Sequence, residues 1–314
     1  MNGSVKATIP ELGADIPSMA RGNDCMLRPG NTNCGGCGMT ISFSMFSRVL
    51  AEEGKRSSVV IPACCAIVAA GGFPTTSFGV PCIAATFAAA PAFAAGIATV
   101  RDINQDSAEV VCWAGDGGTY DIGMATLSAT AERNDNMIYV CYDNEIYGNT
   151  GGQRSSATPP GARTTTTPAG KSEAKKDIIS IMAAHGIPYA ATLSVGHPED
   201  FRRKVKTALG MEGLRFFLIH SPCPTGWKSE PSESVQLVRL AVESGLFPLY
   251  EVFNGRSYRI NHEPEWIDPG EYYSRQRRFP KGSIDLEAVR RECRKNYDRL
   301  KVLAEQFPVQ GQPA

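Results

Sequence analysis

The sequence has no excess of charge and very little histidine. Its 314 residues contain 32 Lys and Arg against 32 Asp and Glu, so no overall field would attract nucleic acid or an anionic membrane. Only four histidines are present, and no GxSxG motif accompanies them, so hydrolase chemistry is unsupported. We expect binding neither to nucleic acid nor to a membrane.

Charge is also missing from one long stretch. Residues from Ser57 to Val100 include no Asp, Glu, Lys or Arg, and the part from Val80 to Val100 is long enough to raise the question of a membrane span. Alanine dominates this part, and it contains Pro81 and Pro91. We therefore expect a buried core segment in place of a membrane span. A large uncharged surface would also suit a subunit interface.

The N-terminus has no recognisable secretory signal peptide. The ten cysteines are spread over the whole chain and do not form a compact disulfide framework, so a reducing cytoplasm is the expected location. Several of them, such as Cys82, Cys112 and Cys141, lie in apolar runs. These are expected to be small buried hydrophobic side chains without a chemical role.

The central stretch from Val110 to Gln153 predicts one α/β unit. A β-branched apolar run from Glu109 to Trp113 predicts a buried strand, and the following GDGG segment permits a tight backbone turn. A helix is expected from about Thr119 to Glu132, followed by a second strand from Met137 to Tyr142. The connection between two such strands is right-handed, so the sheet should be parallel.

Two polar residues follow these strands directly. Asp116 and Asn144 would lie at the carboxyl ends of neighbouring strands, which is where ligands bind in open α/β sheets. A carboxylate, a carboxamide and a helix N-terminus suit Mg²⁺ bound to a diphosphate. An isolated GDG is more often only a turn. Other nucleotide motifs are weaker, since Tyr120 replaces the third glycine of GxGxxG and no glycine stands five residues before Gly170 in a Walker A pattern.

The rest of the chain continues the α/β alternation, so one domain spanning residues 1–314 is expected, with a mostly parallel sheet and helices on both faces. Residues 1–22 resemble an extended arm. Residues 250–314 form a C-terminal extension, with a hairpin around Asn254-Gly255 and a charged helix from Leu286 to Gln306.

A cysteine motif precedes the central unit. Cys34 and Cys37 form a CxxC at the start of a predicted helix, where thiolates are stabilised. CxxC alone fits a redox dithiol, half of a zinc site or half of an iron–sulfur site. The pair Cys64-Cys65 and the distant Cys223 supply further ligands. Zinc is the less favoured metal, because structural zinc sites usually bring a second close pair of ligands.

These motifs together resemble a known family. GDG followed at this distance by DNEIYGNTGGQRS resembles the thiamine-diphosphate motif in the beta subunit of the 2-oxoacid:ferredoxin oxidoreductases. The similarity extends to the RPGN segment before Cys34, to TTTTPAGK from Thr164 to Lys171, and to CPTGW from Cys223 to Trp227.

The resemblance implies a thiamine-diphosphate-binding fold and a role for each matching residue. It implies a Mg²⁺ held by Asp116, Asn144 and the carbonyl group of Ile146. The residues implied to face the diphosphate are Gly115, Gly117, Gly118 and Thr119. It also implies that Asn149 and Thr150 bind the cofactor beside its thiazolium ring. Polar donors at that position stabilise developing charge.

The resemblance also implies a 4Fe-4S cluster held by Cys34, Cys37, Cys65 and Cys223. The family usually has glycine before the third of these cysteines, whereas this chain has Cys64. Cys64 therefore stays an alternative to Cys65 as the ligand.

In the family, the thiazolium carbanion attacks the 2-oxo carbon, carbon dioxide leaves, and single electrons pass through the cluster to ferredoxin. The implied partners are a pyrimidine-binding alpha subunit, which supplies a glutamate, and a ferredoxin-like cluster subunit, so the chain alone should be inactive. A non-redox thiamine-dependent decarboxylase or synthase is an alternative, but it has no use for four cysteines. A metal-cluster scaffold without catalysis is another, against which the Asp116 and Asn144 pair argues.

Departures from the family pattern bear on the substrate. Gly79 and Cys82 stand where tryptophan is usual, and Ala88 and Ile67 stand where glutamate is usual. Loss of two carboxylates would make the neighbourhood less repulsive to a dianion. We therefore expect the small 2-oxo acid to be oxalate, which would need no coenzyme A, slightly ahead of pyruvate.

Overall fold

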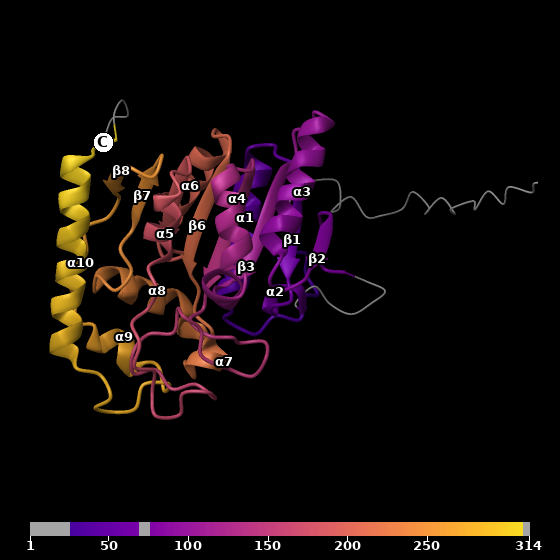
Figure 1. Ribbon diagram of the computed structural model, residues 1–314. Coiled ribbons are helices and arrows are strands. Elements are labelled where there is room, and N and C mark those ends of the chain that lie inside the picture. Colours follow the sequence, from indigo (N-terminus) through magenta and orange to yellow (C-terminus); the bar gives the residue numbers. More distant parts are fainter. Residues whose placement is uncertain (1–25, 69–75, 310–314) are drawn as a thin grey trace, which may run out of the picture.

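The computed structural model describes residues 26–68 and 76–309. Over these residues eight strands form one sheet in the order β2-β1-β3-β4-β6-β5-β7-β8 (Figure 1). The six strands from β2 to β5 in this order are parallel, and β7 and β8 add antiparallel to that edge. The predicted mostly parallel sheet is confirmed. The strands are β1 Ser57–Pro62, β2 Cys82–Ala85, β3 Glu109–Gly115, β4 Met137–Asp143, β5 Tyr189–Leu193, β6 Leu214–His220, β7 Tyr250–Phe253 and β8 Ser257–Ile260.

Helices cover both faces of this sheet (Figure 1). Side chains of α3, α4 and α5 pack on one face, and those of α1 and α6 pack on the other. The helices are α1 Gly38–Glu52, α2 Cys65–Val68, α3 Ala90–Ile103, α4 Met124–Arg133, α5 Ile178–Ala184, α6 Pro198–Leu209, α7 Pro224–Trp227, α8 Ser234–Glu243, α9 Gly270–Ser274 and α10 Leu286–Gln306.

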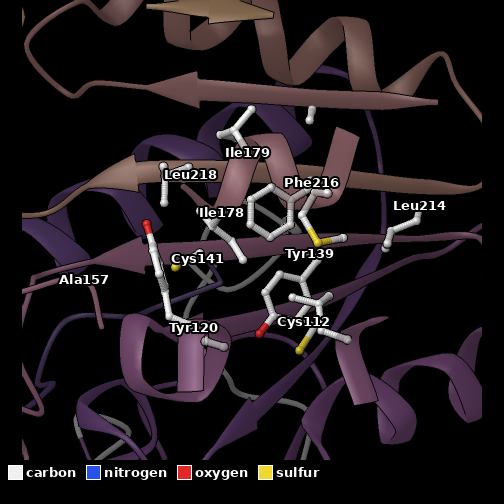
Figure 2. Close-up of a cluster of buried hydrophobic side chains, with 14 of the residues drawn as sticks. Cys112, Tyr120, Tyr139, Cys141, Ala157, Ile178, Ile179, Leu214, Phe216 and Leu218 are labelled. Atoms are coloured by element: carbon white, nitrogen blue, oxygen red, sulfur yellow. The ribbon is translucent and has the colours of Figure 1, made fainter. Parts of the chain in front are cut away.

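Central strands are buried on both faces, which explains their unbroken apolar sequences. Successive residues of β3 alternate between two hydrophobic clusters, with Cys112 in one and Trp113 in the other. Figure 2 shows part of the first cluster, where the rings of Tyr139 and Phe216 stack 5.6 Å apart. Cys112 and Cys141 are buried as predicted. Cys82 lies on the edge strand β2 and is only half-buried, so that prediction was wrong.

The helix predicted from Thr119 to Glu132 is divided into two parts. A π-helical turn spans Gly117–Asp121, and α4 begins only at Met124. Gly123 joins them so tightly that a Cβ atom there would lie 1.9 Å from the carbonyl oxygen of Gly118. Nothing in the sequence indicated that the helix would begin with a separate π-helical turn, because helix propensity alone does not identify such a turn.

The uncharged stretch is not the uniform core that we expected. It contains β1, α2, β2 and α3, and one side of α3 is open to solvent. Phe93 is 46% exposed, Val100 57% and Ile103, at the end of the helix, 75%. Within the described residues, no helix is long and apolar enough to cross a membrane.

The C-terminal extension follows its predicted course. The hairpin turns at Asn254-Gly255 between β7 and β8, and α10 spans the predicted residues beside β8. Gly255 has a φ of +64°, and a Cβ atom there would lie 2.1 Å from the carbonyl oxygen of Ala183, so this turn requires glycine. The proposed N-terminal arm, residues 1–22, lies outside the described residues.

Candidate functional site

Asp116 and Asn144 lie side by side at the carboxyl edge of the sheet. They directly follow the ends of β3 and β4, where Gly115 is paired in register with Tyr142. The side chains are almost fully enclosed, with residue exposures of 1% for Asp116 and 6% for Asn144. Two strand ends therefore bring together residues that the sequence separates by a whole helix.

The Asn144 carboxamide meets two oxygen atoms. One of its terminal atoms lies 2.8 Å from Oδ1 of Asp116 and 2.6 Å from the carbonyl oxygen of Ile146. With nitrogen in that place, the amide donates a hydrogen bond to each oxygen. With oxygen there, three oxygen atoms converge at spacings close to the roughly 2.9 Å between adjacent ligands of an octahedral Mg²⁺. The site therefore fits a hard divalent cation.

Charge balance at Asp116 also fits a cation. Burial and the neighbouring Asp143 carboxylate raise its pKa well above the usual range, although the hydroxyl group of Ser155 donates a hydrogen bond to it. A bound divalent cation would supply the positive charge that favours the ionised carboxylate.

The glycine turn makes a narrow pocket next to these oxygens. The pocket is lined by Phe87, Gly115, Gly117, Gly118, Tyr147, Asn149 and Thr150, among others. A Cβ atom on Gly117 would lie 2.4 Å from the Tyr147 ring, so this ring can pack against the turn only because the residue is glycine. Thr119 differs from the expectation, because its hydroxyl donates to the carbonyl of Gly115 at 2.8 Å inside the core. The Thr119 hydroxyl is therefore already engaged inside the protein.

Asn149 and Thr150 lie on the exposed rim of the same pocket. Their loop is closed by the backbone hydrogen bond from Tyr147 to Gln153, 3.0 Å long. The Thr150 hydroxyl is already used, donating to the Gln153 side chain at 2.6 Å. Asn149 is thus the freer of the two predicted polar groups.

The four predicted cluster ligands gather beside the pocket. A Cβ atom on Gly148 would lie 3.5 Å from Sγ of Cys65 and 3.8 Å from Sγ of Cys223. The Thr225 hydroxyl lies 3.9 Å from Sγ of Cys34. Cys37 caps the N-terminus of α1, whose first residue, Gly38, donates to the carbonyl of Pro222 at 2.9 Å.

The alternative ligand Cys64 points elsewhere. It is 7% exposed and belongs to the hydrophobic cluster with Tyr142 and Trp113. Burial raises its pKa, while a hydrogen bond with Tyr142 opposes that change. The geometry therefore favours Cys65, which faces the other three cysteines.

The spacing of the sulfur atoms bears on the metal. Over the part of the chain that the structure describes, no three cysteine sulfurs come within 4.8 Å of one another. Four thiolates around zinc would lie roughly 3.8 Å apart, from Zn–S bonds of about 2.3 Å. Burial and the neighbouring thiols raise the pKa of Cys65 to about 12 and that of Cys223 to about 11, so holding them as thiolates requires a metal. The wider spacing suits a larger group than one ion.

Comparison with known proteins identifies the family. The family model described as "Thiamine pyrophosphate enzyme, C-terminal TPP binding domain" matches residues 64–221. The chain is 43% identical to ketoisovalerate oxidoreductase subunit VorB of Pyrococcus horikoshii, with 88% of this chain and 93% of the relative covered. It is 44% identical to pyruvate synthase subunit PorB of Methanothermobacter marburgensis, with 81% and 89% covered. The chain belongs to the beta subunits of the 2-oxoacid:ferredoxin oxidoreductases.

A solved structure supports the same fold. A 2-oxoglutarate:ferredoxin oxidoreductase from Magnetococcus marinus aligns with a TM-score of 0.58 over 88% of this chain and 93% of that chain, at 23% identity. The beta subunit thus has a thiamine-diphosphate-binding domain, and it is one part of a multi-subunit oxidoreductase.

A charged network beneath the pocket escaped the sequence analysis. Lys175 lies 2.7 Å from Asp143 and 3.0 Å from Glu145, and Arg278 donates a hydrogen bond to Glu145 at 2.5 Å. Burial opposes ionisation of Glu145, but the two cations lower its pKa to about 2. The network flanks Asn144 on both sides along the chain of the beta subunit and so holds the turn that carries Asn144. The only signal in the sequence was an unusual pair of acids at the end of an apolar strand.

Proposed function

We propose that this beta subunit binds thiamine diphosphate through a Mg²⁺ held by Asp116, Asn144 and the carbonyl of Ile146. It further holds a 4Fe-4S cluster on Cys34, Cys37, Cys65 and Cys223. In its complex it oxidatively decarboxylates a small 2-oxo acid and passes single electrons through the cluster to ferredoxin.

One observation carries this proposal. A Cβ atom on Gly148 would lie within 3.8 Å of the Asn144 carboxamide, of Sγ of Cys65 and of Sγ of Cys223. A single glycine therefore separates the oxygen ligands from two of the thiols. A cluster on those thiols would adjoin the cofactor pocket, which is the arrangement that electron transfer between them requires.

The roles of the residues follow from their positions. When bound, thiamine diphosphate supplies the carbanion that attacks the 2-oxo carbon and then stores the electrons. Asp116 and Asn144 anchor the diphosphate end through the metal, and the rings of Phe87 and Tyr147, 5.9 Å apart, screen the glycine turn from water. Asn149 presents its carboxamide at the rim, where it stabilises developing negative charge.

The exposed side of α3 supports a partner at this edge. Phe93 and Val100 lie on it, and Phe87 of the pocket lies a few residues before the helix begins. We assign this surface to the pyrimidine-binding alpha subunit, which would supply the missing glutamate, and expect a ferredoxin-like subunit nearer the cysteines. The expected cytoplasmic setting suits the nine cysteines of the described residues, all of which are free thiols.

For the substrate we place pyruvate ahead of oxalate, which reverses the order argued from sequence. Two relatives reported above are named for pyruvate and ketoisovalerate, both monocarboxylic 2-oxo acids. The absence of carboxylates at Ala88 and Ile67 is equally compatible with a small apolar substrate side chain. Oxalate stays the alternative substrate.

A non-redox decarboxylase or synthase leaves the convergence of four cysteines unexplained, and a scaffold without catalysis leaves the three converging oxygens unexplained.

The test is anaerobic purification of the complex with iron, sulfide, zinc and thiamine diphosphate measured together. Iron and sulfide of about four each in the beta subunit once it is separated from the ferredoxin-like subunit, with thiamine diphosphate present in the complex, support the proposal. Iron and sulfide absent from the beta subunit would contradict the redox role.

The same preparation identifies the substrate. Reduction of an artificial electron acceptor is followed with pyruvate, 2-ketoisovalerate or oxalate, with and without coenzyme A. We expect turnover of pyruvate that depends on coenzyme A. Turnover of oxalate alone, without coenzyme A, would make oxalate the preferred substrate, as expected from the sequence. The isolated beta subunit is the control, and its full activity would refute the need for a partner.

A further inference from the structure

Three side chains that can bind a metal ion lie close together outside the cofactor pocket. They have no part in the proposed reaction. His197 precedes α6, Glu243 is the last residue of α8, and His262 follows β8. Nε2 of His262 lies 2.8 Å from Oε1 of Glu243, and Nε2 of His197 lies 3.3 Å from the same oxygen. Within the described part of the chain, this is the one group of three such side chains whose ligand atoms all lie within 4.8 Å of one another.

The spacing fits one small divalent cation. Ligand atoms at the corners of a zinc tetrahedron lie roughly 3.3 Å apart, from bonds of about 2.0–2.1 Å. The N···O distance at His197, 3.3 Å, matches this value, the one at His262 is shorter at 2.8 Å, and the two imidazole rings are 4.9 Å apart between centroids. Two neutral imidazoles and one carboxylate are a donor set that zinc and similar transition metals prefer. Small side-chain shifts would bring all three to bonding distance.

Outer contacts hold the three groups in place. Nδ1 of His197 lies 3.4 Å from the hydroxyl of Ser194, and the backbone N–H of Glu265 donates to Oε2 of Glu243 at 3.1 Å. The Tyr297 hydroxyl donates to the carbonyl of His262 at 3.2 Å. Such second contacts fix the ring orientation of ligating histidines in known metal sites.

The three side chains are also accessible to an ion from solvent. The side chains are 18% exposed at His197, 17% at Glu243 and 31% at His262, which allows an ion to enter and a water molecule to complete its coordination.

We propose that His197, Glu243 and His262 form a binding site for a divalent transition-metal cation of the zinc type. The ion joins the segment after β8 to the ends of α6 and α8. Because Tyr297 of α10 contacts the same segment, the ion also fastens the C-terminal helix to the sheet. This site is separate from the proposed magnesium and iron–sulfur sites, and it adds a structural role to them.

The alternative is a metal-free triad in which both Nε2–H groups donate to the Glu243 carboxylate. The two states differ at Nε2, which carries a proton in the triad and a metal in the proposed site. The chain has four histidines, at positions 185, 197, 220 and 262, so ¹⁵N resonances of the imidazole rings can each be followed by NMR in the full chain. Thiols that also bind zinc do not contribute to this signal.

The experiment titrates the chelator-treated full chain with Zn²⁺. We expect Nε2 of His197 and His262 to shift at micromolar Zn²⁺, while His185 and the buried His220 stay unchanged, together with a rise in Tm that a chelator reverses. His262→Gln should weaken this binding by more than the roughly 10- to 100-fold that loss of an outer contact costs. His185→Gln is the matched control, because His185 makes one side-chain hydrogen bond, to Ser128, outside the site.

Glu243→Gln provides a second variant, since its amide oxygen can still accept from the Glu265 backbone while the anionic ligand is lost. Folding of both variants is checked by circular dichroism. Loss of the His197 shift in both supports the site. Unchanged His197 and His262 resonances in the wild type, or shifts only at millimolar Zn²⁺, would show an adventitious ion only and overturn the proposal.

Discussion

The oxygen site and the cysteine site of the beta subunit adjoin each other, yet they are built differently. Asp116 and Asn144 come from two adjacent strand ends and are almost fully buried. The four cysteines come from three separate segments, with Cys65 at the start of α2, and Cys34 is exposed while Cys37, Cys65 and Cys223 are half-buried. The Asn144 carboxamide lies within hydrogen-bonding distance of the Asp116 carboxylate and the Ile146 carbonyl, whereas no three of the cysteine sulfurs in the described residues lie within 4.8 Å of one another.

This difference follows from the chemistry of the ligands. The Asn144 carboxamide can donate a hydrogen bond to the Asp116 carboxylate, which also accepts one from Ser155, so hydrogen bonds hold the oxygen site together. Thiols are weak hydrogen-bond partners, and here burial raises the pKa of two of them. The hydrogen bonds from Asn144 and Ser155 therefore hold Asp116 more firmly than the weak hydrogen bonds to sulfur hold Cys34 and Cys223.

The largest effect is expected from Asp116→Ala. It removes the one carboxylate among the proposed Mg²⁺ ligands, and loss of a buried charge partner costs on the order of 3 kcal/mol, or about 100-fold in affinity. Isothermal titration with thiamine diphosphate and Mg²⁺ measures this. Asp102→Ala, at a half-exposed position on α3, is the control and should leave the affinity unchanged. Equal affinities in both variants would remove Asp116 from the site.

The next largest effect separates Cys65 from Cys64. Cys65→Ser should lower the iron content about tenfold or more, because a proposed ligand is lost, while thiamine diphosphate is retained. Cys64→Ser should keep its iron but lose about 1–3 kcal/mol of stability, since a hydroxyl enters an apolar cluster. Iron analysis and urea denaturation of both variants decide this. The reverse pattern would make Cys64 the ligand.

A smaller effect tests how tightly the glycine turn is packed. Gly117→Ala places a Cβ atom 2.4 Å from the Tyr147 ring, which Asp121 holds through a 2.9 Å hydrogen bond. We expect overpacking of about 1–3 kcal/mol and a cofactor affinity reduced about tenfold. In Gly118→Ala the new atom meets the Phe87 ring at 3.2 Å, so its effect should be smaller. Similar losses in both variants would indicate that Tyr147 moves freely.

Much of the oxygen site could be predicted from sequence, because its ligands follow two apolar strands in one contiguous motif. The cysteine site needed the family resemblance, since Cys223 is far from the CxxC motif and no periodicity connects them. Lys175 and Arg278 were missed because they come from loops, where the sequence has no pattern that predicts burial. The stretch that contains α3 was expected to be buried core or a subunit interface, and its buried and exposed sides could not be distinguished because alanine-rich segments look alike in both environments.

His220 lies between the two regions and provides the smallest predicted effect. It ends β6 opposite Asp143 of β4, and Cys223 follows three residues later. It is 3% exposed, and its Nε2 lies 3.0 Å from the Tyr272 hydroxyl. Burial lowers its pKa to about 4, with Lys175 and Arg278 acting in the same direction and Glu145 against them. The ring is therefore neutral at pH 7.

Because the folded pKa lies below the unfolded value of about 6.5, the unfolded chain binds the proton first as the pH falls. His220 should therefore contribute less stability below pH 6.5, losing about 1 kcal/mol between pH 6.5 and 5.5. Protonation of Glu145 lowers the free energy of unfolding only below about pH 4.5. The raised pKa values of Asp116 and Asp143 increase the free energy of unfolding as the pH falls, which opposes the effect of His220. The measurement is accordingly the difference in urea-unfolding free energy between wild type and His220→Phe across this range. His185→Gln serves as the control, and a difference that does not change with pH would show that His220 titrates normally.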